Sequence, residues 1–292
     1  MVIGANGVLG TAILQQLGKD TAIAATRAGR LPLPGFDHVQ LGPDGVSPSV
    51  DLTRCRAVIN AAGVVRGDRA TIEAANIQLP MAIATAAKAA GVAKFVQVSS
   101  FSVYGAVELI GAETPEFPTS AYGKSKAHGD AALQALADDR FAVESLRLPF
   151  MFSSSKAGLL GPLLSAVDKF GVLPDVAGRP VARSMMTYSD AAATLVDCAR
   201  DSKTGISLAA DPQLFDYHLF KAVLEQAAGR RFSIISVPGK LADLIAWTLP
   251  PVGRRLFRSS KLDERCNRAG NLPLGLEHSL RDLAGNFFSQ RK

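Results

Sequence analysis

The first ten residues carry the feature that most constrains the fold. A short apolar strand, Val2-Ile3, leads into a glycine-rich turn, Gly4-Ala5-Asn6-Gly7-Val8-Leu9-Gly10, and then into a helical run through Leu17. The glycines permit a tight turn and close backbone approach, and the helix start offers free N–H groups and a favourable dipole to a pyrophosphate. The alternative is a plain βα turn. We favour a dinucleotide site, with these candidate ligands: Gly4, Asn6, Gly7, Val8, Leu9 and Gly10.

Strands and helices alternate along the first half of the chain. We expect further strands at 22–26, 38–41, 57–60, 94–98 and 142–148, with helices at 72–90 and from Ser120 onward. Such alternation indicates a parallel sheet with right-handed crossovers. We therefore predict an α/β fold, a Rossmann-type doubly wound parallel sheet. Residues 1–150 would form the cofactor-binding domain, and residues 151–292 a smaller C-terminal α/β substrate lobe, with the chain crossing back near 183–200.

The second half has a different composition. We expect helices at 159–170, 190–200 and 219–228, strands at 185–188 and 231–237, and a loop at 153–158. The apolar segment 241–249 contains the only tryptophan, Trp247, and is followed by Arg254, Arg255 and Arg258. It could be a membrane-surface element. Because it is short and is interrupted by Pro250-Pro251, we favour a helix packed over the substrate cleft.

Two further segments concern the predicted cofactor. An acid at the end of the second strand would bind a ribose 2′-hydroxyl, but here the chain has Arg27, with Arg30 nearby. A guanidinium suits a 2′-phosphate, so we favour NADP(H), while NAD(H) stays open. After the strand at 57–60, the small residues Ala61, Ala62 and Gly63 would let a cofactor lie close.

Tyr122 and Lys126 are the candidate acid–base pair. Residues four apart on a helix share a face, and a nearby cation favours the phenolate and lowers a tyrosine pKa. Such a pair could move a proton to or from a substrate oxygen. Ser100 ends the strand that begins at Lys94, and ligands of open α/β sheets lie outside the carboxyl ends of the strands. Taken alone, a Tyr-x-x-x-Lys pair is common by chance, and the alternative is a surface helix with a snorkelling lysine.

Composition narrows the range of partners. The 292-residue chain is 48% hydrophobic and has a net charge of +6, but no basic block is interleaved with aromatic residues, so we expect no nucleic acid. The three cysteines and four histidines are dispersed, so we expect no metal and a cytoplasmic location. No apolar run is long enough to span a bilayer, and we expect no membrane partner. The chain could form a homodimer.

Four motifs occur in order: Gly4-x-x-Gly7-x-x-Gly10, Asn60-Ala61-Ala62-Gly63, Ser99-Ser100-Phe101-Ser102-Val103-Tyr104-Gly105 and Tyr122-Gly123-Lys124-Ser125-Lys126. In these the chain resembles the extended short-chain dehydrogenase/reductases, the NAD-dependent epimerase/dehydratase family. The resemblance implies that Tyr122 is the acid/base, that Lys126 tunes it and binds the nicotinamide ribose, and that Ser100 binds the substrate hydroxyl. Asn76 resembles the family's structural helix asparagine.

The second half is similar to nucleotide-sugar members of that family. Arg183 opens a segment like their Arg-x-x-x-His-x-x-Asp, which implies a contact with the diphosphate of a sugar nucleotide, and Arg258 could join Arg254 and Arg255 there. Thr187 replaces the usual histidine. Phe101-Ser102 stand where dehydratases carry an Asp-Glu pair, which argues against dehydration.

We therefore expect an NAD(P)-dependent oxidoreductase or epimerase that acts on a nucleoside-diphosphate sugar. Alternatives are an NADPH-dependent reductase of a non-sugar carbonyl compound and a non-catalytic NADP-sensing regulatory subunit. The intact set Ser100, Tyr122 and Lys126 argues against a pure sensor, which has no need of all three.

Overall fold

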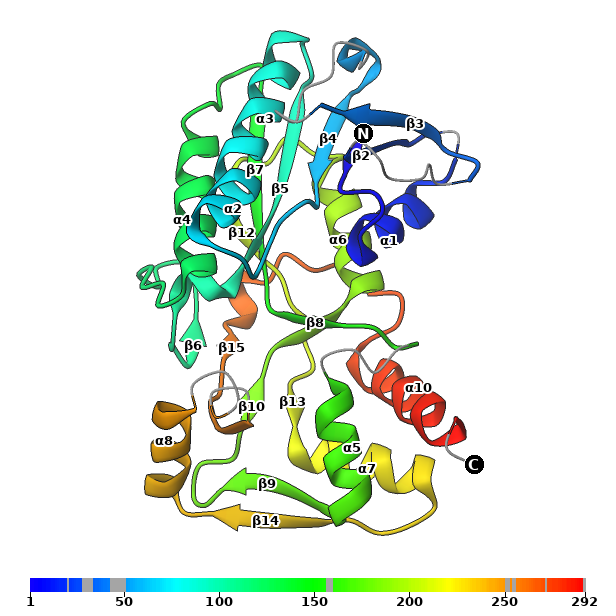
Figure 1. The fold of residues 1–292 in the computed structure, drawn as a ribbon. Coiled ribbons are helices and arrows are strands. Elements are labelled where there is room, and N and C mark those ends of the chain that lie inside the picture. Colours follow the sequence, from blue (N-terminus) through cyan, green and yellow to red (C-terminus); the bar gives the residue numbers. More distant parts are fainter. Residues whose placement is uncertain are drawn as a thin grey trace.

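A parallel sheet of seven strands forms the centre of one half of the molecule in Figure 1, a computed structural model. The structure describes residues 1–19, 21–27, 34–42, 51–155, 160–249, 253, 256–270 and 272–290. The strand order β12-β7-β5-β4-β1-β2-β3 places β1 at the point where the order reverses. The strands are Val2–Ile3 (β1), Ile23–Arg27 (β2), Asp37–Leu41 (β3), Ala57–Asn60 (β4), Lys94–Ser100 (β5), Ala142–Leu148 (β7) and Gly205–Leu208 (β12).

Helices cover both faces of this sheet (Figure 1). Successive strand residues point to opposite faces, so Val96 of β5 packs with α1 and α6, while Phe95 packs with α3 and α4. The result is two apolar layers with the sheet between them, which is the predicted Rossmann-type α/β architecture. The helices are Val8–Leu17 (α1), Arg69–Glu73 (α2), Leu79–Ala89 (α3), Ala121–Gln134 (α4) and Tyr188–Cys198 (α6).

The predicted helix at 72–90 differs from the observed one. It begins at Arg69 and passes through a π-helical turn, Ala74–Gln78, between α2 and α3. The wider turn carries the buried Asn76, whose side chain binds the backbone of Val64 on the neighbouring loop. This tertiary contact explains the departure from α-helical geometry. The strands predicted at 22–26, 38–41, 57–60, 94–98 and 142–148 are confirmed, with shifts of up to two residues at their ends.

The elements after residue 148 form a second apolar cluster, below the large sheet in Figure 1. Three strand pairs support it: β8 with β11 and β9 with β14, both parallel, and β10 with β13, antiparallel. Of these strands only β11 and β14 were predicted; β8, β9, β10 and β13 were not. These elements are Phe150–Phe152 (β8), Gly161–Phe170 (α5), Val172–Val176 (β9), Ala182–Arg183 (β10), Met185–Thr187 (β11), Phe215–Asp216 (β13), Tyr217–Ala228 (α7), Ser233–Val237 (β14), Gly239–Thr248 (α8) and Leu276–Ser289 (α10).

The boundary between the two lobes at residue 150 stays a prediction, and elements from beyond it join the large sheet. α6 packs against α1, and β12 pairs with β7. Lys261–Leu262 (β15) pairs with Leu109–Ile110 (β6), so the C-terminal segment also returns to the first half of the chain. The loop expected at 153–158 is described only through Ser155.

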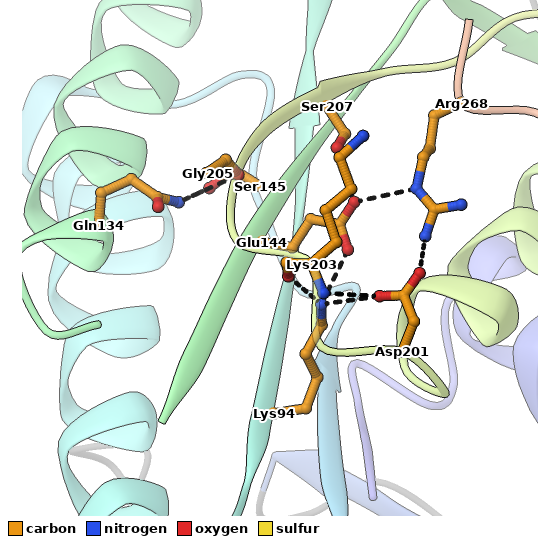
Figure 2. Close-up of polar contacts among 9 residues, drawn as sticks. All are labelled: Lys94, Gln134, Glu144, Ser145, Asp201, Lys203, Gly205, Ser207 and Arg268. Carbon is orange, nitrogen blue, oxygen red and sulfur yellow. Dashed lines mark hydrogen bonds and ion pairs between the residues drawn. The ribbon is translucent and has the colours of Figure 1, made fainter. Parts of the chain in front are cut away.

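A buried ionic cluster lies at the amino ends of β5 and β7 (Figure 2). The ammonium group of Lys94 lies 2.9 Å from a Glu144 carboxylate oxygen and 3.3 Å from Asp201. Arg268, from the returning C-terminal segment, contacts both Glu144 and Asp201, and Ser207 of β12 donates to Glu144 at 2.6 Å. The cluster joins four distant stretches of chain. It lies six residues from Ser100 along β5, roughly 20 Å from the carboxyl edge of the sheet.

Among the described residues, no helix is both long and apolar enough to cross a membrane.

Candidate active site

The helix α4 carries Tyr122 and Lys126 along the carboxyl edge of the sheet. Ser120 caps it: its hydroxyl accepts a hydrogen bond from the backbone N–H of Gly123 at 3.0 Å. Two glycines let the helix pack closely. A Cβ at Gly123 would overlap the carbonyl oxygen of Ser102, and one at Gly129 would overlap that of Asn76. Glycine at these two positions therefore sets how near Tyr122 comes to the end of β5.

The Ser100 hydroxyl lies beside the Tyr122 phenol and acts on its pKa. The Ser100 hydroxyl also accepts from the backbone N–H of Ser102 at 3.1 Å, which fixes its position at the end of β5. Burial raises the pKa of the Tyr122 phenol, and the neighbouring Ser100 hydroxyl opposes that rise. The sequence led us to expect a lowered pKa. That expectation is wrong for this structure, because desolvation of the phenolate dominates.

Lys126 is fully buried behind this pair. Its ammonium group donates to the carbonyl oxygen of Val98 at 3.0 Å and lies 6.0 Å from the centre of the Tyr122 ring. Burial lowers the Lys126 pKa to about 8, while the charge of Asp130 raises it. A Cβ at Gly63 would stand 3.3 Å from the same nitrogen, so the Ala61-Ala62-Gly63 segment lies directly beside it. The candidate catalytic lysine and this candidate cofactor segment therefore adjoin.

Asn76 and Ser125 hold the surroundings in place. The Asn76 amide accepts from the backbone N–H of Val64 at 3.0 Å, and donates to the Val64 carbonyl and to the Ser125 hydroxyl, both at 2.9 Å. Ser125 in turn donates to the carbonyl oxygen of Tyr122 at 2.8 Å. These bonds connect the π-helical turn, the loop after β4 and α4. They agree with the structural role expected for Asn76.

The glycine-rich turn has the shape that a dinucleotide pyrophosphate needs. Gly4 has a φ of +74°, and a Cβ there would come within 2.8 Å of the Ala62 backbone nitrogen. A Cβ at Gly10 would overlap the carbonyl oxygen of Gly4. Gly7 closes the turn by donating to that carbonyl at 2.9 Å, and α1 begins at the next residue. Only glycine fits at Gly4 and Gly10, so the backbone and the start of α1 fit the predicted cofactor.

Arg27 is the last residue of β2 and is exposed at the same edge. Before it, Thr26 shares a hydrogen bond of 2.7 Å with the His38 ring of β3. Its predicted neighbour Arg30 lies outside the described residues. Arg27 thus stands where the sequence expects a contact with the ribose end of the cofactor.

Sequence reasoning missed a buried network beneath Lys126. Asp130, one turn further along α4, accepts from the Ser99 hydroxyl at 2.7 Å and from the Arg147 guanidinium at 3.0 Å. Arg147 also donates to the Tyr104 hydroxyl at 2.9 Å and contacts Glu116. Burial raises the Asp130 pKa, which Arg147 and Lys126 both lower. The spacing of Asp130 from Lys126 was the available signal, since residues four apart share a face.

The two candidate substrate arginines meet through the backbone. The Arg183 guanidinium donates to the carbonyl oxygen of Arg258 at 2.7 Å, and burial lowers the Arg183 pKa. The Arg258 guanidinium lies instead 3.4 Å from Asp243 of α8, which Arg179 also contacts at 2.8 Å. Arg254 and Arg255 lie outside the described residues. Of the four predicted arginines, the structure therefore brings Arg183 and Arg258 into contact, by a bond from the Arg183 side chain to the Arg258 backbone.

This fold and this edge of the sheet define a Rossmann-type enzyme of the nicotinamide-dependent class. The chain belongs to the NAD dependent epimerase/dehydratase family, whose sequence model matches residues 1–160. It is thus an NAD(P)-dependent enzyme, as the four motifs predicted. Comparison with curated protein sequences found no match.

Solved structures share the fold over nearly the whole chain. A short-chain dehydrogenase/reductase superfamily protein from Agrobacterium tumefaciens with bound NAD has a TM-score of 0.76 at 18% identity, covering 99% of this chain and 97% of that one. UDP-glucuronic acid 4-epimerase from Bacillus cereus, in complex with NAD, has a TM-score of 0.72 at 14% identity, covering 100% and 99%. MoeE5 in complex with UDP-glucose and NAD has a TM-score of 0.70 at 19% identity, covering 99% and 98%. At these identities the likeness establishes the fold.

Proposed function

We propose that the protein is an NAD(P)-dependent epimerase or oxidoreductase that acts on a nucleotide-activated sugar. One observation carries the proposal: the Ser100 hydroxyl lies beside the Tyr122 phenol, with Lys126 one helical turn away beside Gly63. The hydroxyl, the phenol and the ammonium group thus converge on the edge where the glycine-rich turn would hold the cofactor.

The chain's own groups would handle the proton. When bound, the nicotinamide exchanges a hydride with a carbinol or ketone carbon of the substrate. Ser100 would orient the substrate oxygen, and Tyr122 would give that oxygen a proton or take one from it. Lys126, with a pKa of about 8, is mostly charged at neutral pH and would stabilise the phenolate that forms when Tyr122 gives up its proton.

The sugar part of the proposal has separate support. Two of the solved structures that share this fold carry UDP-glucose or are named for UDP-glucuronic acid. In this chain Arg183 is a half-buried guanidinium on β10, which suits an anion better than a surface arginine does. A bound diphosphate would accept from it and relieve the desolvation that lowers its pKa.

The central test is Tyr122→Phe. A panel of UDP- and dTDP-sugars first identifies the sugar that the unaltered protein turns over. We expect the variant to turn over that sugar about 10²–10⁴-fold more slowly, with cofactor affinity nearly unchanged. Tyr188→Phe is the matched control, because Tyr188 begins α6 and packs against the apolar layer that contains α1. Near-native turnover by Tyr122→Phe would remove Tyr122 from the mechanism.

We propose NADP(H) as the preferred form of the cofactor, on the strength of Arg27. Calorimetric titration should show tighter binding of NADPH than of NADH. Arg27→Ala should lose about 1.5–3 kcal/mol of NADPH binding and spare NADH, since hydrogen bonds to charged groups are of that size. Equal affinity of the unaltered protein for both cofactors would contradict the NADP preference and leave NAD(H) as the cofactor.

The substrate class is tested by thermal shift. UDP or dTDP should raise the Tm of the cofactor-bound protein, because a ligand that binds only the native state stabilises it. Arg183→Ala should remove most of that shift and leave the cofactor's own shift in place. Arg179→Ala is the control, since Arg179 is exposed and pairs with Asp243. If no nucleoside diphosphate shifts the Tm, the reductase of a non-sugar carbonyl compound becomes the better proposal.

A further inference from the structure

The helix α8 has its large apolar side chains on the outside. Ala242 and Ala246 are buried, while Leu241, Leu244 and Trp247 are 47%, 52% and 78% exposed. Leu249, which follows the helix, is 58% exposed. At 3.6 residues per turn, the three large residues lie on one side and the two alanines on the other. A helix packed over a cleft by its apolar face would bury the large residues and expose the alanines. The interpretation that we favoured from the sequence, a helix packed over the substrate cleft, is therefore wrong for Leu241, Leu244 and Trp247.

The inner face of α8 has no room for these side chains. The backbone of Gly253 approaches so closely that a Cβ there would stand 2.5 Å from the Ala246 Cα and the Ile245 carbonyl oxygen. Turning the helix to bury Trp247 would push a large ring into that contact. The packing thus keeps this face outward, and among the described residues nothing buries Leu244 or Trp247.

The charges around this face are mostly positive. Lys240 is exposed at the start of α8, and Arg179 and Arg258 both approach the carboxylate of Asp243, at 2.8 and 3.4 Å. These three cations outnumber the single described anion of the helix, Asp243. Large apolar residues with a tryptophan on one face and basic groups beside them are typical of helices that lie in a membrane interface.

We propose that α8 docks this lobe on the surface of a bilayer that contains anionic lipids. Leu241, Leu244 and Trp247 enter the interface, and Lys240 and the flanking arginines lie among the headgroups. The helix has ten residues and is about 15 Å long, too short to cross a bilayer. Because its large apolar side chains lie on one side, it would lie along the surface. The proposal concerns where the enzyme works and does not depend on its substrate.

A second copy of this chain fits the face less well. Two copies meeting through α8 would bring the same cations together, in a protein that already carries a net charge of +6. A stable interface also buries about 800 Å² of each partner, so a dimer would need further surface beyond this ten-residue helix. Anionic headgroups supply the opposite charge, and their attraction adds over each basic residue near the surface.

The only tryptophan of the chain is Trp247, so its fluorescence reports on this face without a label. We expect a blue shift of its emission on vesicles of phosphatidylcholine with phosphatidylglycerol, and quenching by brominated acyl chains. Vesicles of phosphatidylcholine alone, or added salt, should weaken both effects. The full chain is used throughout. No blue shift on the anionic vesicles would overturn the proposal.

Variants localise the effect. Leu244→Asp keeps the reporter and should lower vesicle binding in co-sedimentation on the order of tenfold or more, and Leu241→Asp should act likewise. Phe170→Asp is the matched control, because Phe170 is 66% exposed on the same lobe. The strands β9 and β14 are parallel partners; Phe170 precedes the start of β9, whereas α8 follows the opposite end of β14. If Leu244→Asp binds vesicles as the unaltered protein does, or changes only the oligomeric state by sedimentation, the proposal fails.

Discussion

At the scale of single residues, Lys126 shows how burial and one carboxylate act on the same group. Desolvation lowers the Lys126 pKa to about 8, and Asp130 is the charge that raises it. Burial raises the pKa of Asp130 itself, and Arg147 and Lys126 oppose that rise. The charge state of the candidate catalytic pair therefore depends on a residue that would not touch the substrate.

Asp130→Asn should lower the Lys126 pKa below about 8. The amide can still accept from Ser99 and Arg147, but it removes the negative charge, so desolvation of the ammonium group is no longer opposed. The ¹³Cε resonance of Lys126, titrated by NMR, measures this pKa. Asp138→Asn is the control, because that carboxylate is exposed and pairs with Lys88. A Lys126 pKa that stays the same or rises in Asp130→Asn would contradict the assignment.

The sequence predicted which residues meet at this site, but not their electrostatics. Spacing of four on a helix was sufficient to put Tyr122 and Lys126 on one face, and the end of a parallel strand was sufficient to put Ser100 near them. The direction of the Tyr122 pKa shift depends on burial, which spacing does not reveal. Asp130 was missed because it lies on α4 while its partner Arg147 lies on the strand β7, 17 residues away.

At the scale of elements, the contact between α4 and the π-helical turn determines where Tyr122 stands. A Cβ at Gly129 would overlap the carbonyl oxygen of Asn76, and Asn76 in turn holds the loop after β4. The two elements meet through backbone, so neither can move aside as a flexible side chain would. We expect this contact to tolerate no added methyl group.

Gly129→Ala should destabilise the protein by about 1–3 kcal/mol, because overpacking outweighs the roughly 0.8–1 kcal/mol by which alanine favours a helix. Gly285→Ala, within α10, is the matched control: nothing lies within 4 Å of its added Cβ, so we expect a gain of up to about 1 kcal/mol. Urea unfolding of the two variants gives the comparison. Equal stabilisation by both would show that α4 is not closely packed on this turn.

The elements that the sequence predicted best are those with a clear pattern. The buried strands of the large sheet are continuous apolar runs, and the glycine turn fixes the start of α1. The π-helical turn was not visible, because the run from 72 to 90 is rich in alanine and small apolar residues leave no sharp periodicity. The strand β12 has only four residues and gains its position from pairing with β7.

At the scale of the whole molecule, residues far apart in sequence contact one another and hold the C-terminal segment against the first half of the chain. Arg268 and Glu144 are 124 residues apart, yet they meet at the amino end of the sheet (Figure 2). The sequence predicted a doubly wound sheet and a second lobe, but not that the C-terminal segment returns to the first half. Nothing local in residues 256–270 specifies β6, Glu144 or Asp201 as partners.

Lys94→Met tests how strongly this cluster holds the molecule together. Lys94 and Glu144 are 4% and 0% exposed as side chains, so removing the cation leaves a carboxylate that cannot reach water. Arg268 and Ser207 still contact Glu144, and the expected loss in the free energy of unfolding is about 3–5 kcal/mol or somewhat less.

The control is Arg69→Met, which breaks an ion pair of similar length, 2.8 Å, between side chains that are 88% and 38% exposed. Exposed pairs within a helix contribute about 0.3–0.5 kcal/mol, so this variant should unfold in urea almost as the unaltered protein does. If both variants lost the same small amount, the cluster would not be needed for stability, and the return of the C-terminal segment would rest on the β15–β6 pairing and its backbone contacts.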